Sequence, residues 1–295
     1  MGKGSTAIHV HEPALHPQMA GRRPWESDRV SFSIGAAGRT DRGHRRSENQ
    51  DCILCDVSTD GTMGIFAVAD GMGGQRAGEV ASAITVATLR EHLLPLLHED
   101  QPAAVARALA QPTGVSPSGT QSLSEVVNAA INHCNERILL HAAAHPETRG
   151  LGSTLTLVLI KGSLAVIGNI GDSRTYRVRG EAIERLTHDH SLVAHLAAIG
   201  QIAPDDVYSH PHRSYIYRAL GTESEAQPDI MTERLQSGDT LLLCSDGLWE
   251  MVRDGDIHHA IAGASSPDEV ATRLVAMANS NGGEDNISAI VVKVS

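Results

Sequence analysis

Aromatic residues and cysteines are scarce in this chain of 295 residues. Aromatic residues make up 3% of the sequence, so Val, Ile, Leu and Ala must fill any core, and a hydrophobic content of 41% is sufficient for one. The 4 cysteines are too few and too scattered for a disulfide scaffold, and they favour a reducing compartment. Cys52 and Cys55 form a C-x-x-C pair without a second pair, which is more typical of an ordinary strand than of a zinc or redox site.

The chain also lacks a basic excess and a long apolar run. Its 24 basic and 35 acidic residues give a net charge of −11, which argues against nucleic acid as the principal partner. Phosphorylated substrates stay possible, because a bound cation can reverse the local field. We find no window long and apolar enough to span a bilayer, and no apolar stretch typical of a signal peptide near the N-terminus. We therefore expect a cytoplasmic protein without a membrane partner.

The first residues differ in composition from the rest. Residues 1–29 are rich in His, Pro, Gly and Arg and show no periodicity, which predicts a flexible leader before a domain at 30–295. His9, His11 and His16 could bind a metal there, but scattered histidines in a leader are more often inert.

The periodicity from residue 30 onward predicts antiparallel sheets with helices on their outer faces, an α+β layered domain. Ser122 or Ser124 and Ser266 are the expected N-caps of two helices. A polar stretch at 187–228 resembles a functional excursion more than a core element. The expected strands are 30–37, 53–57, 63–69, 153–160, 164–169, 174–179, 240–244 and 286–294, the helices are 79–97, 123–144, 254–261 and 268–279, and 111–121 is a loop.

Three aspartates stand where an apolar, strand-like run meets a turn of small residues: Asp70, Asp246 and Asp285. One Asp-Gly turn means little, since both residues are ordinary in turns. Three such carboxylates in one chain predict a divalent-metal centre, and a metal centre suggests hydrolysis. The alternatives are three solvated turn aspartates, or a calcium-binding module, for which the spacing of an EF-hand or a repeat is missing.

Six short motifs then occur in a fixed order. They are "RSENQD" (46–51), "ADGMGG" (69–74), "GST" (152–154), "GDSR" (171–174), "SDGLW" (245–249) and "EDN" (284–286). In this order they resemble the metal-dependent serine/threonine protein phosphatases of type 2C, the PPM family, in its bacterial form, over roughly residues 31–294. The resemblance implies two antiparallel β-sheets sandwiched between outer layers of antiparallel α-helices, four layers in the order α-β-β-α, with 187–228 as the flap of the family.

The resemblance also implies the metal ligands. Asp70 would bridge two Mg²⁺ or Mn²⁺ ions, the Gly71 carbonyl would bind the second ion, and Asp246 and Asp285 would hold the first. Such ions keep several waters in an octahedral shell, and a pair ~3.5–4 Å apart can activate a water for direct attack on a phosphoryl group. Asp172 would hold a third, weaker ion, unless it merely caps its turn.

Other residues take supporting roles by the same resemblance. Arg46 would clamp the substrate phosphate, and its spacing from Asp51 favours it over Arg45 and over a merely solvated loop arginine. Asp51 would orient a metal-bound water, and Asn286 and Gln50 would also stand just outside the direct ligands. Arg174 is expected to be structural.

Two positions depart from the family pattern. Gln50 replaces a common Glu, so the second ion could bind more weakly or only through water. Met72 fills the place of a histidine that is the proposed general acid in eukaryotic members, and methionine cannot donate a proton. His188, His190 and His212 lie in the flap, where surface or packing roles are commoner than catalysis.

The expected activity is hydrolysis of phosphoserine and phosphothreonine in proteins. It implies phosphoprotein substrates and a cognate serine/threonine kinase, and we expect a monomer. The rival interpretation is a catalytically silent member that binds phosphoproteins as a regulator. Silent members usually lose metal carboxylates, whereas Asp70, Asp172, Asp246 and Asp285 are all present.

Overall fold

The computed structural model describes residues 32–74, 77–98, 122–148 and 150–295. The expected leader at 1–29, with His9, His11 and His16, lies outside the described residues, and so does the loop expected at 111–121.

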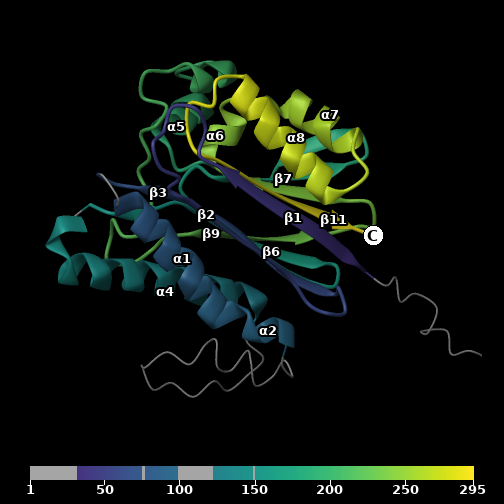
Figure 1. The fold of residues 1–295 in the computed structure, drawn as a ribbon, viewed down its shortest axis with the longest axis horizontal. Helices are drawn as coiled ribbons and strands as arrows, with labels where there is room; N and C mark the ends of the chain where they lie inside the picture. Colours follow the sequence, from purple (N-terminus) through teal and green to yellow (C-terminus); the bar gives the residue numbers. More distant parts are fainter. Residues whose placement is uncertain (1–31, 75–76, 99–121, 149) are drawn as a thin grey trace, which may run out of the picture. The chain divides into compact units, whose positions relative to one another are not determined.

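Two antiparallel sheets form the centre of the domain (Figure 1). One has the strand order β1-β11-β10-β7-β8, and the other has the order β2-β3-β5-β6-β9, with the short β4 paired to β3. The strands are β1 (Ile34–Asp41), β2 (Asp51–Val57), β3 (Met63–Met72), β4 (Gly152–Ser153), β5 (Leu155–Lys161), β6 (Leu164–Ile170), β7 (Arg174–Arg179), β8 (Ala182–Arg185), β9 (Asp229–Arg234), β10 (Thr240–Cys244) and β11 (Ile287–Val294).

Helices cover the outer face of each sheet, with α1 and α4 on one side and α7 and α8 on the other (Figure 1). Ser122 caps α4 in a capping box with Glu125, and Ser266 caps α8, as the sequence predicts. The helices are α1 (Ala77–Leu93), α2 (Pro95–His98), α4 (Leu123–Ala144), η1 (Pro146–Thr148), α5 (Leu192–Ala198), η2 (Pro204–Tyr208), α6 (Asp246–Trp249), α7 (Asp254–Ala262) and α8 (Pro267–Ser280).

Three apolar layers hold these four layers together. Ile65 and Ala67 of β3 face α1 and α4, while Phe66 and Val68 of the same strand face the second sheet, because successive side chains of a strand point to opposite faces. A third cluster lies between that second sheet and α7 and α8. The four-layer α-β-β-α arrangement that the resemblance implies is thereby confirmed.

The C-x-x-C pair lies within β2 and cannot act as one site. Cys52 packs in the layer beneath α1, whereas Cys55 packs between the sheets, so the two thiols face opposite sides of the strand. Both cysteines are free. The ordinary strand is therefore the correct interpretation.

Several boundaries differ from the sequence prediction. The first described strand is Ile34–Asp41 and not 30–37, because the polar residues up to Asp41 also pair with β11, while residues 30 and 31 lie outside the described residues. The helix expected at 79–97 is two helices, since Pro95 starts a second one. The sequence reasoning missed β8 and β9, whose polar, half-exposed residues lack the apolar signal of the central strands.

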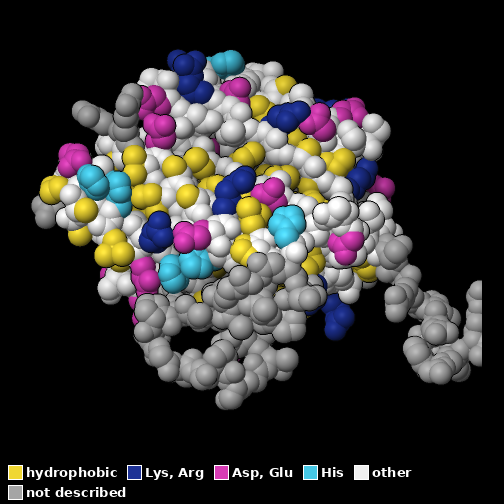
Figure 2. All heavy atoms as spheres, turned by 60° about the horizontal axis from the view of Figure 1, so that its bottom comes forward, with side chains coloured by type: hydrophobic (Ala, Val, Ile, Leu, Met, Phe, Trp, Pro, Cys, Tyr) yellow, Lys and Arg dark blue, Asp and Glu magenta, His cyan; other side chains and the backbone are white. Residues whose placement is uncertain are grey.

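One expectation about membranes needs correction. The segment Ala77–His98 is long and apolar enough that, by length and composition alone, it could span a bilayer. The apolar residues of this segment, such as Leu89 and Leu93, serve the core of the domain, and 44% of its most apolar window is buried against the rest of the structure. Figure 2 brings the face of α1 and α4 forward and shows apolar side chains mixed with charged and histidine side chains.

The topology gathers the motifs at one end of the two sheets. Asp51 at the start of β2 pairs with Asp70 near the end of β3. In the other sheet Cys244 at the end of β10 pairs with Arg174 at the start of β7 and with Ala289 of β11. Turns that lie far apart in the sequence therefore meet at this end.

Candidate metal centre

A hollow of about 210 Å³ lies where these turns meet. All four aspartates that the sequence predicts as metal ligands line it, together with Gly71 and Arg46. The full lining is Arg46, Gln50, Asp70, Gly71, Met72, Gly73, Thr154, Asp172, Ser214, Ile216, Asp246, Asp285 and Asn286.

Backbone contacts hold Asp70 and Gly71 at the wall of the hollow. The Asp70 N–H donates to Thr154 Oγ1 at 3.1 Å, and the Gly71 N–H donates to the Gln50 carbonyl at 3.1 Å. A Cβ on Gly71 would stand 1.9 Å from the Gly78 carbonyl oxygen, so only glycine lets the first turn of α1 approach this strand end.

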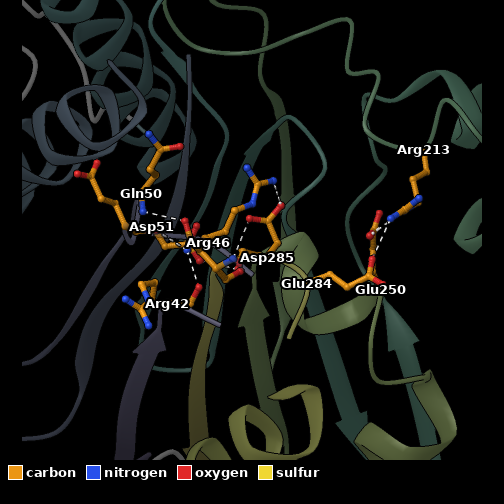
Figure 3. A network of polar contacts seen from close by, with 11 residues as sticks. Arg42, Arg46, Gln50, Asp51, Arg213, Glu250, Glu284 and Asp285 are labelled. Carbon is orange, nitrogen blue, oxygen red and sulfur yellow. Dashed lines mark hydrogen bonds and ion pairs between the residues drawn. The ribbon is translucent and has the colours of Figure 1, made fainter. Parts of the chain in front are cut away.

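The turn that carries Asp246 packs against the turn that carries Asp285. A Cβ on Gly247 would stand 2.1 Å from the Asn286 carbonyl oxygen, which leaves no room for a side chain. Asn286 also ties the "RSENQD" loop to this place. Its amide donates to the carbonyls of Arg42 and Glu48, both at 2.9 Å, and its Oδ1 accepts from the Gln50 N–H at 2.8 Å (Figure 3).

Asp51 joins the two sheets directly behind the hollow. It is 5% exposed, and its Oδ2 accepts hydrogen bonds from Ser245 Oγ at 2.8 Å and Ser288 Oγ at 2.7 Å. Its Oδ1 is buried without a hydrogen-bond partner. One carboxylate oxygen is thus fixed by the protein, and the other stays available to a group in the hollow.

The carboxylates of the hollow repel one another. Burial and then the charge of Asp51 raise the pKa of Asp70 well above its ordinary value, and burial and then the charge of Asp172 do the same to Asp246. Burial, followed by the charge of Asp189, raises the pKa of Asp172 to about 7, and burial raises that of Asp51 to about 6. Such a cluster is costly unless a cation neutralises it.

The residues fit hydrated divalent ions better than a closed, all-protein cage. Asp246 Oδ1 is buried without a hydrogen-bond partner, like Asp51 Oδ1. Within the described ranges, no three Asp, Glu, His or Cys side chains converge closely enough to form a complete ligand group. Mg²⁺ and Mn²⁺ tolerate this arrangement, because they take one or two carboxylates and complete an octahedral shell with water.

Arg46, and not Arg45, reaches the hollow. Its Nη2 lies 2.5 Å from Asp285 Oδ2, and half of its side chain is exposed (Figure 3). The guanidinium therefore lines the cavity beside a predicted metal ligand, which is where a phosphate clamp would stand.

Met72 lines the hollow, and none of the three flap histidines does. His190 is buried with its Nδ1 accepting from the Gly171 N–H at 3.2 Å and its Nε2 3.3 Å from Asp229. His188 and His212 are exposed. The expectation that these histidines serve packing or the surface agrees with these positions.

Sequence reasoning missed the flap residues that complete the cavity. Ser214 and Ile216 line it, and the neighbouring Arg213 forms ion pairs of 3.1 Å with both Glu250 and Glu284 (Figure 3). No local pattern marks these residues, because the flap reaches the hollow only through long-range contacts. Thr154 was within reach of the sequence, since it belongs to the "GST" motif.

Comparison of the sequence with known proteins gives one consistent answer. The family model described as "Protein phosphatase 2C" matches residues 40–288. The serine/threonine phosphatase stp of Listeria innocua is 35% identical over 255 residues, which cover 86% of this chain and 94% of that protein. Protein phosphatase PhpP of Streptococcus pneumoniae is 35% identical over 260 residues, 87% of this chain and 96% of that protein.

Solved structures agree. The serine/threonine phosphatase PstP/Ppp of Mycobacterium tuberculosis superimposes with a TM-score of 0.75 at 33% identity, covering 88% of this chain and 98% of that one. The catalytic domain of PstP in complex with 2 manganese ions gives a TM-score of 0.74 at 32% identity, covering 90% and 99% of the two chains.

Proposed function

The chain belongs to the protein phosphatase 2C family and is a metal-dependent serine/threonine protein phosphatase, and we propose that the acidic hollow is its active site. The observation that carries this proposal is the gathering of Asp70, Asp246 and Asp285 around one cavity, where the pKa values of Asp70 and Asp246 are raised and little protein cation offsets the carboxylates. A catalytically silent regulator would have no use for that cluster.

Asp70, the Gly71 carbonyl, Asp246 and Asp285 would hold two Mg²⁺ or Mn²⁺ ions, and Asp172 would hold a third. When bound, such ions lower the pKa of water and neutralise phosphate oxygens. The chain supplies the placement. Thr154 and Gln50 hold the backbone of the Asp70 turn, and Asn286 ties the Asp285 turn to the "RSENQD" loop.

Arg46 would bind the phosphate of the substrate through two parallel N–H donors. Its present partner, Asp285, is one of the proposed ligands, so an ion on Asp285 leaves the guanidinium available to phosphate. Asp51, whose Oδ2 is held from behind by Ser245 and Ser288, would use its unpartnered Oδ1 to accept a hydrogen bond from a water in the hollow and orient that water.

The substrates would be proteins that carry phosphoserine or phosphothreonine, and a serine/threonine kinase must supply them. We further propose a cytoplasmic monomer that acts in signalling; its few, scattered cysteines favour a reducing compartment, and its relatives are serine/threonine phosphatases. Loss of the gene should raise phosphoserine and phosphothreonine in soluble proteins, and an unchanged phosphoproteome would contradict this role.

The decisive assay is phosphate release from a phosphothreonine peptide. Activity should require added Mg²⁺ or Mn²⁺ and disappear in excess chelator. Undiminished turnover in chelator, after tightly held metal has been removed, would defeat the proposal.

Asp172→Ala tests the third ion separately, because it leaves the other ligands intact. Calorimetry should still find two tightly bound ions, while turnover of the phosphopeptide falls. The loss should be smaller on an aryl phosphate, whose leaving group needs less proton donation. Wild-type turnover of the peptide at saturating metal would reduce Asp172 to a turn residue.

A further inference from the structure

Trp249 is the one residue of the "SDGLW" motif with a large polar-tipped side chain, and the proposed chemistry does not use it. It ends α6, three residues after the proposed ligand Asp246, and is 2% exposed. Three contacts surround its indole, and each leads to a different part of the active site.

The indole N–H fixes the turn that carries Asp172. Trp249 Nε1–H donates to the Asp172 carbonyl at 3.0 Å. This turn connects β6, which ends at Ile170, with β7, which begins at Arg174, and Gly171 within it has φ +100°. A buried indole N–H needs a hydrogen-bond acceptor, and here the acceptor is the Asp172 carbonyl. The same bond therefore fixes the position of that carbonyl.

The face of the indole supports the start of the flap. The Arg174 guanidinium carbon lies 3.4 Å from the ring centre. Arg174 Nε and Nη2 donate to Asp189 at 3.0 Å and 2.7 Å, and both side chains are 3% exposed. Asp189 follows β8 directly into the flap, so a cation–π contact links Trp249 to the point where the flap leaves the sheet.

The edge of the indole supports a second part of the flap. Tyr208, at the end of η2, meets Trp249 edge-on with ring centres 6.0 Å apart at 62°. Arg253 covers the same tyrosine, 3.3 Å from its ring centre. The tyrosine is thereby held between two residues of the segment that follows Asp246.

We propose that Trp249 is a positioning residue that keeps Asp172 and the flap in one fixed relation, so that a displaced flap displaces Asp172. It acts through the Asp172 backbone and touches no substrate atom. The inference rests on the proposed role of Asp172 and adds to it the coupling to the flap. The closeness of Trp249 to Asp246 in the sequence does not explain these contacts. Trp249 contacts the turn after β6, Arg174 of β7 and Tyr208 of η2, which are far from it along the chain.

Two variants separate the arms of this contact. Trp249→Phe removes the N–H donor and keeps an aromatic ring for Arg174 and Tyr208. We expect the Mg²⁺ concentration for half-maximal phosphopeptide turnover to rise about 3- to 10-fold, as the loss of one buried hydrogen bond implies. Calorimetry should still find two tight ions, and high Mg²⁺ should restore kcat.

Tyr208→Leu is the matched variant for the flap arm, because it keeps the Trp249 N–H bond. Hydrogen exchange of the amides at 187–228 should speed up more than in Trp249→Phe. The Mg²⁺ midpoint should rise less than in Trp249→Phe, but above that of the wild type, because the flap pulls on Asp172 through the indole. An unmoved midpoint in this variant would overturn the coupling.

A second measurement keeps Trp249 in place and serves if Trp249→Phe folds poorly. The chain has 2 tryptophans, so Trp25→Phe leaves Trp249 as the only indole and identifies its N–H resonance. This resonance should move with the weaker phase of a Mg²⁺ titration, and that phase should be missing in Asp172→Ala.

The outcomes distinguish the inference from its premise. If Asp172→Ala keeps the wild-type Mg²⁺ response, the proposed role of Asp172 and the inference fail together. Suppose that Asp172→Ala changes the Mg²⁺ dependence but the Trp249 N–H resonance does not move in the weaker phase of the titration. The inference alone is then overturned, and the same holds if Trp249→Phe lowers the melting temperature without changing the Mg²⁺ midpoint.

Discussion

Buried carboxylates lie in two neighbouring places, at Asp189 and in the acidic hollow, and they differ in how their charge is compensated. Asp189 is surrounded by cations, with Arg174 at 2.7 Å and Arg185 at 3.2 Å. The carboxylates of the hollow have little protein cation beside them, since among the described residues only Arg46 forms an ion pair with one of them, Asp285. Asp172 in the hollow is 4% exposed and Asp189 is 6% exposed, so burial alone does not explain the difference.

The comparison teaches how a binding site differs from a structural ion pair. The protein completes the charge balance of Asp189 by itself, so this pair needs no external cation. In the hollow the protein leaves the charges of the carboxylates uncompensated, and burial together with mutual repulsion raises the pKa of Asp70 and Asp246. An external cation is needed to neutralise these carboxylates, and this need marks the hollow as a functional site.

The largest effect should come from Asp70→Asn, among the uncompensated carboxylates of the hollow. Removing one charge from the proposed bridge should lower kcat by about three orders of magnitude or more, because both ions lose a ligand. The melting temperature of the metal-free protein should stay or rise, since a repelling carboxylate is gone. Steady-state kinetics and calorimetry measure the two effects, and near-wild-type kcat would exclude Asp70 as the bridge.

The same Asp-to-Asn replacement at Asp189 should lower the stability of the fold. Asp189→Asn leaves the buried Arg174 without its carboxylate, and breaking a buried ion pair in this way costs about 3–5 kcal/mol. Urea unfolding of metal-free Asp189→Asn and Asp70→Asn compares two identical replacements. Equal stabilities in the two variants would break the distinction between the two places.

Arg46→Ala should have an intermediate effect on catalysis. Loss of the phosphate clamp should lower kcat/KM about 10- to 100-fold on phosphopeptide. Metal binding should survive, because Asp285 loses only a competitor. Arg45→Ala is the control, and a larger loss in that variant would show that the wrong arginine has been assigned.

The smallest effect concerns pH. Asp172 has its pKa raised to about 7 and Asp51 to about 6, from an unfolded value of 3.8. Between pH 3.8 and about 7 the folded metal-free protein therefore holds more protons than the unfolded chain, so its stability falls as pH rises.

Bound Mg²⁺ should suppress this fall, because it stabilises the ionised carboxylates. Melting temperatures with chelator and with Mg²⁺ should therefore diverge as pH rises through the window. Parallel curves would mean that the cluster is balanced in some other way.

Local patterns were sufficient for much of the fold. The central strands and the long helices could be predicted, because β3 is a continuous apolar run buried on both faces and α4 repeats its buried residues along one side. The polar β8 and β9 could not, since they become strands only by pairing with β7 and β6.

The sequence by itself determined which aspartates gather, because each stands at a turn whose glycine admits a close approach, as Gly71 and Gly247 do. Tertiary structure alone decided what surrounds them. It placed Ser245 and Ser288 on Asp51, the flap residues Ser214 and Ile216 on the cavity, and Trp249 on Asp172. These contacts join segments far apart along the chain, so their energies depend on the packing of both sheets and leave no mark in any local pattern.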